Sequence, residues 1–305
     1  MNSIAFDRYL NNVNNLGTRQ FRLLKDKISK IESQKIVAKT LETPQEKLNC
    51  PHCNFNEFYR WGKQSDLQRY KCKRCKKTFN SLTGTYLARL RRKGHWLDYA
   101  KCIKYGKTIR KSAAICKISK STSFRWRHRF LKGTNFIVYN KLNGIIELNE
   151  VKQKRSFKGA VKIPEKFLND RGNIWLLFGR DRDGKTINFI FNEWHPSKIA
   201  IKLNSIISKD SLFCSDDKEE YNELSSRLNL RHGKIDTKRG IYLYKDIVHI
   251  DNVKNYYEYY NLWMKRFKGV ATKYLRNYLS WFRGLEHYKM NPNPKIILLR
   301  AKTKF

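Results

Sequence analysis

The sequence predicts a multidomain α+β protein, and three features support this fold class. Two Cys-x-x-Cys pairs lie in a short block rich in aromatic residues, a strongly basic stretch has the pattern of two helices joined by a tight turn, and residues 143–290 alternate β-like and helical segments. The expected parts are an N-terminal helical segment at 1–45, a metal-bearing ribbon at 46–85, a helix-turn-helix at 86–133, an α/β domain at 141–290 and a basic tail at 291–305.

The first part is expected to contain an amphipathic helix over residues 17–35. Phe21, Leu24, Ile28 and Ile31 recur at steps of three and four residues, which places them on one helical face. Such a face can form part of an ordinary core, dock on the body of the protein, or dock on a second copy of the chain.

The ribbon is defined by Cys50, Cys53, Cys72 and Cys75, which form two C-x2-C pairs separated by 18 residues. This spacing is typical of a tetrahedral site in which four thiolates bind Zn²⁺. Because all four ligands would come from the protein, the zinc is expected to be structural, with one ion per chain. The alternative is four buried free thiols. The aromatic residues that flank the pairs, and that would pack around such a metal, are Phe58, Trp61, Tyr70 and Phe79.

Residues 109–131, IRKSAAICKISKSTSFRWRHRFL, have the pattern of a helix-turn-helix, with Ser119 placed to cap the second helix. That helix carries polar and basic side chains able to reach phosphates and base edges in a DNA major groove. The alternative is the solvated basic face of an ordinary helical hairpin. The side chains expected to contact DNA are Lys120, Ser121, Thr122, Arg125, Arg127 and Arg129.

Charge supports a polyanionic partner. The chain has 65 Lys and Arg against 26 Asp and Glu, a formal net charge of +39, and residues 89–132 hold 15 basic residues and one acid, Asp98. Nucleic acid is the expected partner, whereas a merely Lys-rich surface or an anionic membrane face would be the alternatives. The sequence has no run of 18 apolar residues and no signal-peptide core, so we expect a cytoplasmic protein that does not span a membrane.

Acidic residues end two β-like segments of the α/β region. Glu147 and Glu150 follow GII, Asp216 ends SLFCSD, and a helical segment begins near Asp251. Strand-end acids followed by a helix are the parts from which a two-metal phosphoryl-transfer site is built. Acids at strand ends are also common without any such role.

Ordered blocks in three segments carry a resemblance to a known family. They are CPHCNFNEFYRWGKQSDLQRYKCKRCKKTFNSLTGTYLARLRRK, SKSTSFRWRHRFL, GIIELNE, GRDRDGKT and FKGVATKYLRNYLSWFR. The chain resembles the zinc-ribbon-bearing DDE-type transposases of bacterial insertion sequences, of the ISXO-like type, over roughly residues 45–284. The resemblance implies a ribbon and helix-turn-helix that bind terminal inverted repeats in double-stranded DNA. It also implies an RNase H-like domain that cuts these ends and joins them to target DNA with two Mg²⁺ or Mn²⁺ ions.

The resemblance places the family's three catalytic positions on this chain. The first falls on Asn149, because the family reads Glu-Leu-Asp-Glu where this chain reads Glu-Leu-Asn-Glu, and the second falls on Asp216. The third falls on Lys254, with Asn252 or Asn255 as alternative matches.

These departures reduce the negative charge that two divalent ions need, because Asn149, Asp216 and Lys254 together sum to zero. Glu147 and Asp217 are the acids that would have to compensate. Two hypotheses follow: an active transposase, or an impaired or repurposed copy that binds DNA, in either case as a homo-oligomer on DNA. A zinc-ribbon transcription regulator is a third reading, but it would not need the α/β domain.

Overall fold

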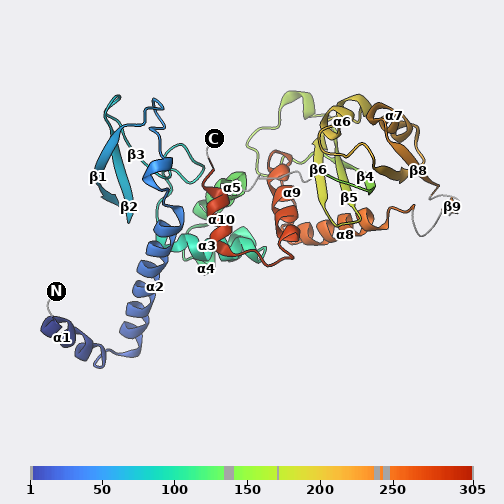
Figure 1. The fold of residues 1–305 in the computed structure, drawn as a ribbon. Coiled ribbons are helices and arrows are strands. Elements are labelled where there is room, and N and C mark those ends of the chain that lie inside the picture. The colour runs from blue at the N-terminus through green and yellow to red at the C-terminus, as the bar shows by residue number, and fades with distance from the viewer. Residues whose placement is uncertain (1–2, 134–140, 170–171, 237–240, 243–247, 304–305) are drawn as a thin grey trace. The chain divides into compact units, whose positions relative to one another are not determined.

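A computed structural model describes residues 3–133, 141–169, 172–236, 241–242 and 248–303. The chain divides into two compact units (Figure 1). The N-terminal unit comprises Met1–Gly133 together with Pro292–Phe305, and the α/β unit comprises Thr134–Asn291. No described helix is both long enough and apolar enough to cross a membrane.

Two helices begin the N-terminal unit, α1 (Ser3–Val13) and α2 (Thr18–Leu41), and α2 contains the helix expected over residues 17–35. Its C-terminal half packs against the unit. The contact is close, because a Cβ added at Gly94 would lie only 2.8 Å from the carbonyl oxygen of Lys30. The N-terminal half projects from the unit (Figure 1), and Phe21, Ile28 and Ile31 are 45–50% exposed. The interpretation of this stripe as ordinary core is therefore wrong.

The ribbon is a three-stranded antiparallel sheet in the order β1-β2-β3. Tyr70 and Phe79 are buried on its inner face beside the cysteines, and Phe58 packs against them with ring centroids 5.0 and 5.2 Å away. Trp61, expected to join this core, lies 45% exposed instead. The elements of this region are η1 (Gln45–Lys47), β1 (Phe58–Gln64), β2 (Leu67–Cys72) and β3 (Thr78–Asn80).

A small helical bundle completes the unit. Its core consists of Trp96, Tyr99, Trp126 and Phe130, all buried and mostly in edge-to-face contact, an arrangement that aromatic rings prefer. The helical elements are η2 (Lys93–His95), α3 (Trp96–Lys104), α4 (Ile109–Ile115), α5 (Lys120–Gly133) and α10 (Pro294–Ala301).

Helix α10 corrects the expectation that residues 291–305 form a basic tail. The Asn293 side chain caps the helix by accepting the Lys295 N–H at 2.9 Å, and Pro294 occupies its first turn. Leu298 and Ala301 are buried against the bundle, and a Cβ at Gly133 would lie 2.4 Å from Ala301 Cα. The C-terminal segment is thus an integral part of the N-terminal unit.

The α/β unit is built on a six-stranded mixed sheet in the order β6-β5-β4-β7-β8-β9. Strands β6, β5 and β4 are antiparallel neighbours, whereas β4, β7 and β8 run parallel. The strands are β4 (Ile145–Lys154), β5 (Asn173–Asp181), β6 (Thr186–Phe191), β7 (Leu212–Asp216), β8 (Arg231–Asp236) and β9 (Ile241–Tyr242), and η3 is Glu165–Phe167.

Helices cover both faces of this sheet. Ile146 and Leu148 of β4 pack in one core with residues of α6 and α7. On the opposite face, Phe178 of β5 contacts Tyr256 and Tyr260 of α8 with ring centroids 5.9 and 5.4 Å away. Because side chains alternate along a strand, Glu147 and Asn149 point to the α8 face. The helices are α6 (Pro196–Leu203), α7 (Glu219–Leu228), α8 (Asp251–Lys265) and α9 (Thr272–His287).

Candidate functional site

The four ribbon cysteines lie together as a cluster that can hold a metal such as zinc. Their sulfur atoms all lie within 4.8 Å of one another. Cys50 Sγ is 3.6 Å from Cys75 Sγ, and Cys53 Sγ is 3.6 Å from Cys72 Sγ. A tetrahedral zinc with Zn–S bonds of about 2.3 Å would separate its sulfurs by about 3.8 Å, so the donor set fits this ion.

The two Cys-x-x-Cys turns have nearly the same backbone conformation. In the first turn the Asn54 N–H donates to the Cys50 carbonyl at 2.8 Å, and in the second the Lys76 N–H donates to the Cys72 carbonyl at 3.1 Å. Asn54 and Lys76 both adopt the left-handed region, with φ of 57° and 58°. This shared turn presents each pair of sulfurs in the same way, so local backbone structure shapes the cluster.

Backbone N–H groups favour the thiolate form of Cys72, whereas burial opposes it at Cys50. Burial acts to raise the pKa of Cys72, but the N–H groups of Cys75 and Arg74 outweigh it and lower the value to about 7. Burial raises the pKa of Cys50 to about 12. A bound zinc would hold all four sulfurs as thiolates and leave no coordination position open, so its chemistry would be architectural.

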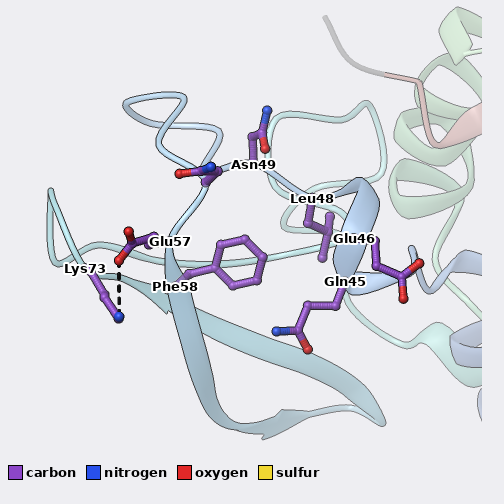
Figure 2. Close-up of a pocket in the computed structure, with 8 residues that line it drawn as sticks. Gln45, Glu46, Leu48, Asn49, Glu57, Phe58 and Lys73 are labelled. Atoms are coloured by element: carbon purple, nitrogen blue, oxygen red, sulfur yellow. Dashed lines mark hydrogen bonds and ion pairs between the residues drawn. The ribbon is translucent and has the colours of Figure 1, made fainter.

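A pocket beside the first turn shows no comparable organisation. Figure 2 shows its lining, in which the polar side chains are all exposed and Phe58 is half-buried. Glu57 and Lys73 form an ion pair of 3.2 Å across it, and an exposed pair of this kind contributes only about 0–1 kcal/mol. We assign no function to this pocket. Its lining residues are Gln45, Glu46, Leu48, Asn49, Asn56, Glu57, Phe58 and Lys73.

Helix α5 carries the second group of candidate residues. Ser119 caps it as expected, since its Oγ accepts the Thr122 N–H at 3.1 Å. Lys120, Ser121 and Arg125 are exposed, and Thr122 is half-buried. The first two turns of α5 therefore present a polar and basic surface.

Two arginines of α5 do not share this surface. Arg127 is 0% exposed, and its guanidinium donates to the Lys107 carbonyl at 2.6 Å and to Ser112 Oγ at 3.1 Å. Arg129 is half-buried and donates to the Ala88 carbonyl at 2.9 Å. The expectation that Arg127 contacts DNA is corrected, because its side chain stabilises the bundle instead, and Arg129 is anchored to the chain before α3.

In the α/β unit, the three positions implied by the family resemblance lie on adjacent elements. Asn149 is half-buried on β4, and continuing the β4–β7 register by two residues places it level with Asp216. Lys254 lies half-buried in the first turn of α8, the helix that packs on this face of the sheet. Of the alternatives for the third position, Asn255 is exposed, whereas Asn252 contacts the sheet.

Glu147 fastens α8 to the sheet. Its carboxylate is 1% exposed and accepts the Asn252 side-chain amide and the Val253 N–H, each at 2.8 Å. Arg182 forms an ion pair with the same carboxylate at 2.6 Å and also donates to His249. A negative charge beside the first N–H groups of a helix is favourable. Glu147 is therefore fully engaged in structural contacts.

The other nearby acids also have cationic partners. Lys218 forms a close ion pair with Glu150 and lies 3.7 Å from Asp216, while the buried Tyr221 hydroxyl donates to Glu150. Burial acts to lower the pKa of Lys218, but Glu150 and Asp216 outweigh it and raise the pKa above its ordinary value. Asp217 is exposed and 3.9 Å from Lys234.

These contacts do not fit a pair of divalent cations. The carboxylates of Glu147, Glu150 and Asp216 are paired with the cations Arg182 and Lys218. Each cation would have to move before a metal took its place.

Arg182 and Lys218 did not emerge as candidates from the sequence. Arg182 lies in the block GRDRDGKT, which carries part of the resemblance, so this block was a usable signal. Lys218 had no such signal, because its partner Glu150 is 68 residues away.

Comparison with known proteins supports a mobile-element relationship. The chain is 26% identical, over 260 residues, to an uncharacterized protein in transposable element ISH50 of Halobacterium salinarum. The match covers 77% of this chain and 83% of the relative. No protein-family model matches the chain. The chain is thus similar to a protein of a transposable element, and it carries a four-cysteine cluster that can hold a metal.

Proposed function

We propose that the chain is a transposase by descent that binds terminal inverted repeats in double-stranded DNA through its N-terminal unit. The observation that carries this proposal is the exposed row of Lys120, Ser121 and Arg125 on the first turns of α5, preceded by the short helix α4. This is the part of a recognition helix that meets base edges in the major groove. The mobile-element relative and the net charge of +39 support the same conclusion.

We infer that the α/β unit is an RNase H-like domain. In support, the first catalytic position of the family, Asn149, lies on the central strand β4, and the second, Asp216, ends its parallel neighbour β7. The third, Lys254, lies on a helix that packs against β4. This arrangement is what a two-metal site requires of its scaffold, even though the side chains themselves have changed.

The same side chains lead us to propose that the domain is catalytically impaired. Asn149 and Lys254 remove two carboxylates, and the remaining acids are paired with Arg182 and Lys218. Binding without cutting would let the protein occupy inverted repeats in the cytoplasm, at the nucleoid.

DNA binding is tested by comparing two arginines of α5. Arg125→Ala is expected to weaken binding to a duplex carrying the terminal repeat by about 1–3 kcal/mol, because an exposed arginine can read a base edge. Arg127→Ala is expected to lower the melting temperature instead, because it removes buried hydrogen bonds of a charged group, worth about 1.5–3 kcal/mol each. Fluorescence anisotropy and thermal unfolding measure the two effects separately.

Arg125→Lys is the matched control, since it keeps the charge but loses the planar, two-pronged donor.

The unmodified chain should also bind random duplex DNA in a salt-dependent way. A plot of log K against log salt concentration is expected to have a slope of about −5 to −9, which corresponds to roughly 6 to 10 phosphate contacts. Equal losses on repeat and random DNA would show that Arg125 contacts phosphate only. An unchanged affinity for both would exclude α5 from the interface.

We further propose that the chain acts as a homo-oligomer, with the exposed stripe of α1 and α2 as the contact between copies. Large apolar side chains are exposed along these helices, and a contiguous exposed apolar patch is typical of a protein–protein contact. The stripe side chains Phe21, Ile28 and Ile31 recur at near-heptad spacing, which suits helix pairing. The other exposed apolar residues of these helices are Phe6, Tyr9, Leu10, Leu23 and Ile36.

Ile28→Ser combined with Phe21→Ser is expected to reduce the mass measured by light scattering to that of a single chain. The exposed Lys25→Ser in the same helix is the control and should leave the mass unchanged. A wild-type chain that is already monomeric, with and without duplex DNA, would contradict this proposal without affecting DNA recognition by α5.

A further inference from the structure

The outer face of the ribbon sheet carries two exposed aromatic side chains on strand β1. Tyr59 is 40% exposed and Trp61 is 45% exposed, and their rings meet edge to face with centroids 5.7 Å apart. The inner face already has its own aromatic packing around the cysteine cluster. Tyr59 and Trp61 are therefore not required to build the ribbon core.

A β-bulge lies at Trp61 and Gly62. Arg60 pairs with Tyr70 and Lys63 pairs with Gln68, so Trp61 and Gly62 together stand opposite one residue, Arg69. Gly62 has φ of +71°, a conformation that glycine adopts without strain. Side chains two positions apart on a strand share a face, so Trp61 lies beside Tyr59 on the same exposed surface.

Basic side chains surround these rings. Lys71 stands opposite Tyr59 in the register, and its Nζ lies 4.4 Å from the centre of the Trp61 ring. Arg69 precedes it by two residues on β2, which places both on one face of the sheet. Residues 58–80 contain eight Lys and Arg and one acid, Asp66. The surface thus combines apolar rings with an excess of positive charge.

We propose that this face, defined by Tyr59, Trp61, Arg69 and Lys71, binds unpaired nucleotides of DNA. Bases stack on the two rings, and the phosphates between them lie near Lys71 and Arg69. In a paired duplex the flat faces of the bases are covered by their neighbours, and only base edges and phosphates are accessible. Aromatic rings bind bases through those flat faces, and basic side chains track the backbone of a single strand.

This inference rests on the proposed DNA-binding function and adds single-stranded DNA as a second ligand. Helix α5 would bind double-stranded DNA, whereas the ribbon would bind single strands that have separated. Exposed Trp, Tyr and Arg are also typical of protein–protein contacts, so the experiment distinguishes a DNA ligand from a protein ligand.

The test measures binding of the full-length, zinc-loaded chain to a labelled 20-nucleotide dT strand and to a random 20-base-pair duplex. Trp61→Ala and Tyr59→Ala are each expected to weaken dT binding roughly 5- to 100-fold, the range found for loss of one stacked base. Duplex binding should change less than about twofold by the same reasoning, because duplex bases cannot stack on these rings. Trp61→Phe keeps a ring and should recover most of the loss.

Two controls separate stacking from charge and from general damage. Tyr259→Ala removes an exposed tyrosine from α8, in the other unit, and should leave dT binding unchanged. Lys71→Ala should lower the magnitude of the dT salt slope by about 0.7, whereas Trp61→Ala should leave that slope as it is. Zinc content measured by elemental analysis should stay at the wild-type value in every ribbon variant.

Wild-type affinity for dT in Trp61→Ala and Tyr59→Ala would overturn the inference, and so would equal losses on dT and duplex. If the wild-type chain binds duplex but not dT, the ribbon face is not a single-strand site, while DNA binding through α5 stands. If it binds neither DNA, the proposed function fails as well. Loss of self-association in Trp61→Ala, with dT binding intact, would assign the face to a protein contact.

Discussion

One zinc ion per chain is the expected result of elemental analysis on protein purified without chelator. The four sulfurs lie within 4.8 Å of one another, and the two cysteine turns hold them in matching geometry. A structural zinc of this kind contributes about 10–16 kcal/mol of apparent binding free energy at neutral pH. The ribbon has only a small core besides the metal. It consists of the cysteines, Tyr70, Phe79 and the partly buried Leu48, Phe55 and Phe58.

Removing the metal is therefore expected to unfold residues 46–85 while the α/β unit keeps its structure. Hydrogen exchange measured with and without chelator should show protection lost in the ribbon and retained in β4, β5 and β7. Cys53→Ser should lower the zinc content in the same way. Cys214→Ala is the control, because Cys214 is buried in β7, outside the cluster, and its loss should leave one zinc per chain. A chain without zinc, or a ribbon still protected after chelation, would contradict the metal centre.

The ribbon was the part of the site that the sequence predicted best, because its ligands are close in the chain. A C-x2-C pair can form only a few turns, so spacing alone restricts the geometry. The expectation that Trp61 joins the ribbon core was wrong, and strand alternation was the usable signal. Phe58 and Trp61 are three positions apart on β1 and therefore lie on opposite faces.

Helical periodicity separates the two arginines Arg125 and Arg127 of α5, whereas net charge does not. Ser123, Trp126, Arg127 and Phe130 follow steps of three, one and three residues and share the buried face. Arg127 lies on that face, whereas Arg125 lies away from it. Net charge directed attention to every arginine alike, and only the period separates them.

The sequence of the C-terminal helix α10 was compatible with either an irregular tail or a helix. Prolines at 292 and 294 indicated an irregular tail, yet proline in the first turn of a helix is favourable because its missing N–H has no helical partner there. Ile297, Leu298 and Ala301 have helical spacing and are buried. Their packing partners lie far earlier in the chain, so sequence alone could not show that the segment returns to the N-terminal unit.

The contacts of Glu147 could not have been predicted at all. Its partners Arg182 and Asn252 are 35 and 105 positions away in the sequence. Strand alternation correctly placed Glu147 on the face of Asn149, but it gave no indication that the carboxylate was already engaged. In the folded protein the carboxylate of this candidate metal ligand instead connects β4 to α8 through hydrogen bonds.

The unmodified chain is expected to bind its terminal repeat but neither nick nor join it in Mg²⁺ or Mn²⁺. Each missing carboxylate removes a ligand for a metal that contributes several kcal/mol to transition-state stabilisation. On the proposed assignment of the third position, Lys254 adds a positive charge in place of a ligand, and Lys218 is 3.7 Å from Asp216. A strand-transfer assay on a labelled terminal repeat measures both nicking and joining, and Asp216→Ala serves as the blank.

Restoring the carboxylates one at a time tests this account. Asn149→Asp alone is expected to remain inactive, because Lys254 still repels a metal bound there. Asn149→Asp with Lys254→Glu makes the site more negative by three charges and returns both missing ligands, so joining above the Asp216→Ala blank is expected. Asn149→Asp with Lys254→Gln is the matched control, since it removes the ammonium without adding a carboxylate. Robust joining by the unmodified chain, abolished by Asp216→Ala, would contradict the impaired site and show that other groups, Glu147 first among them, complete it.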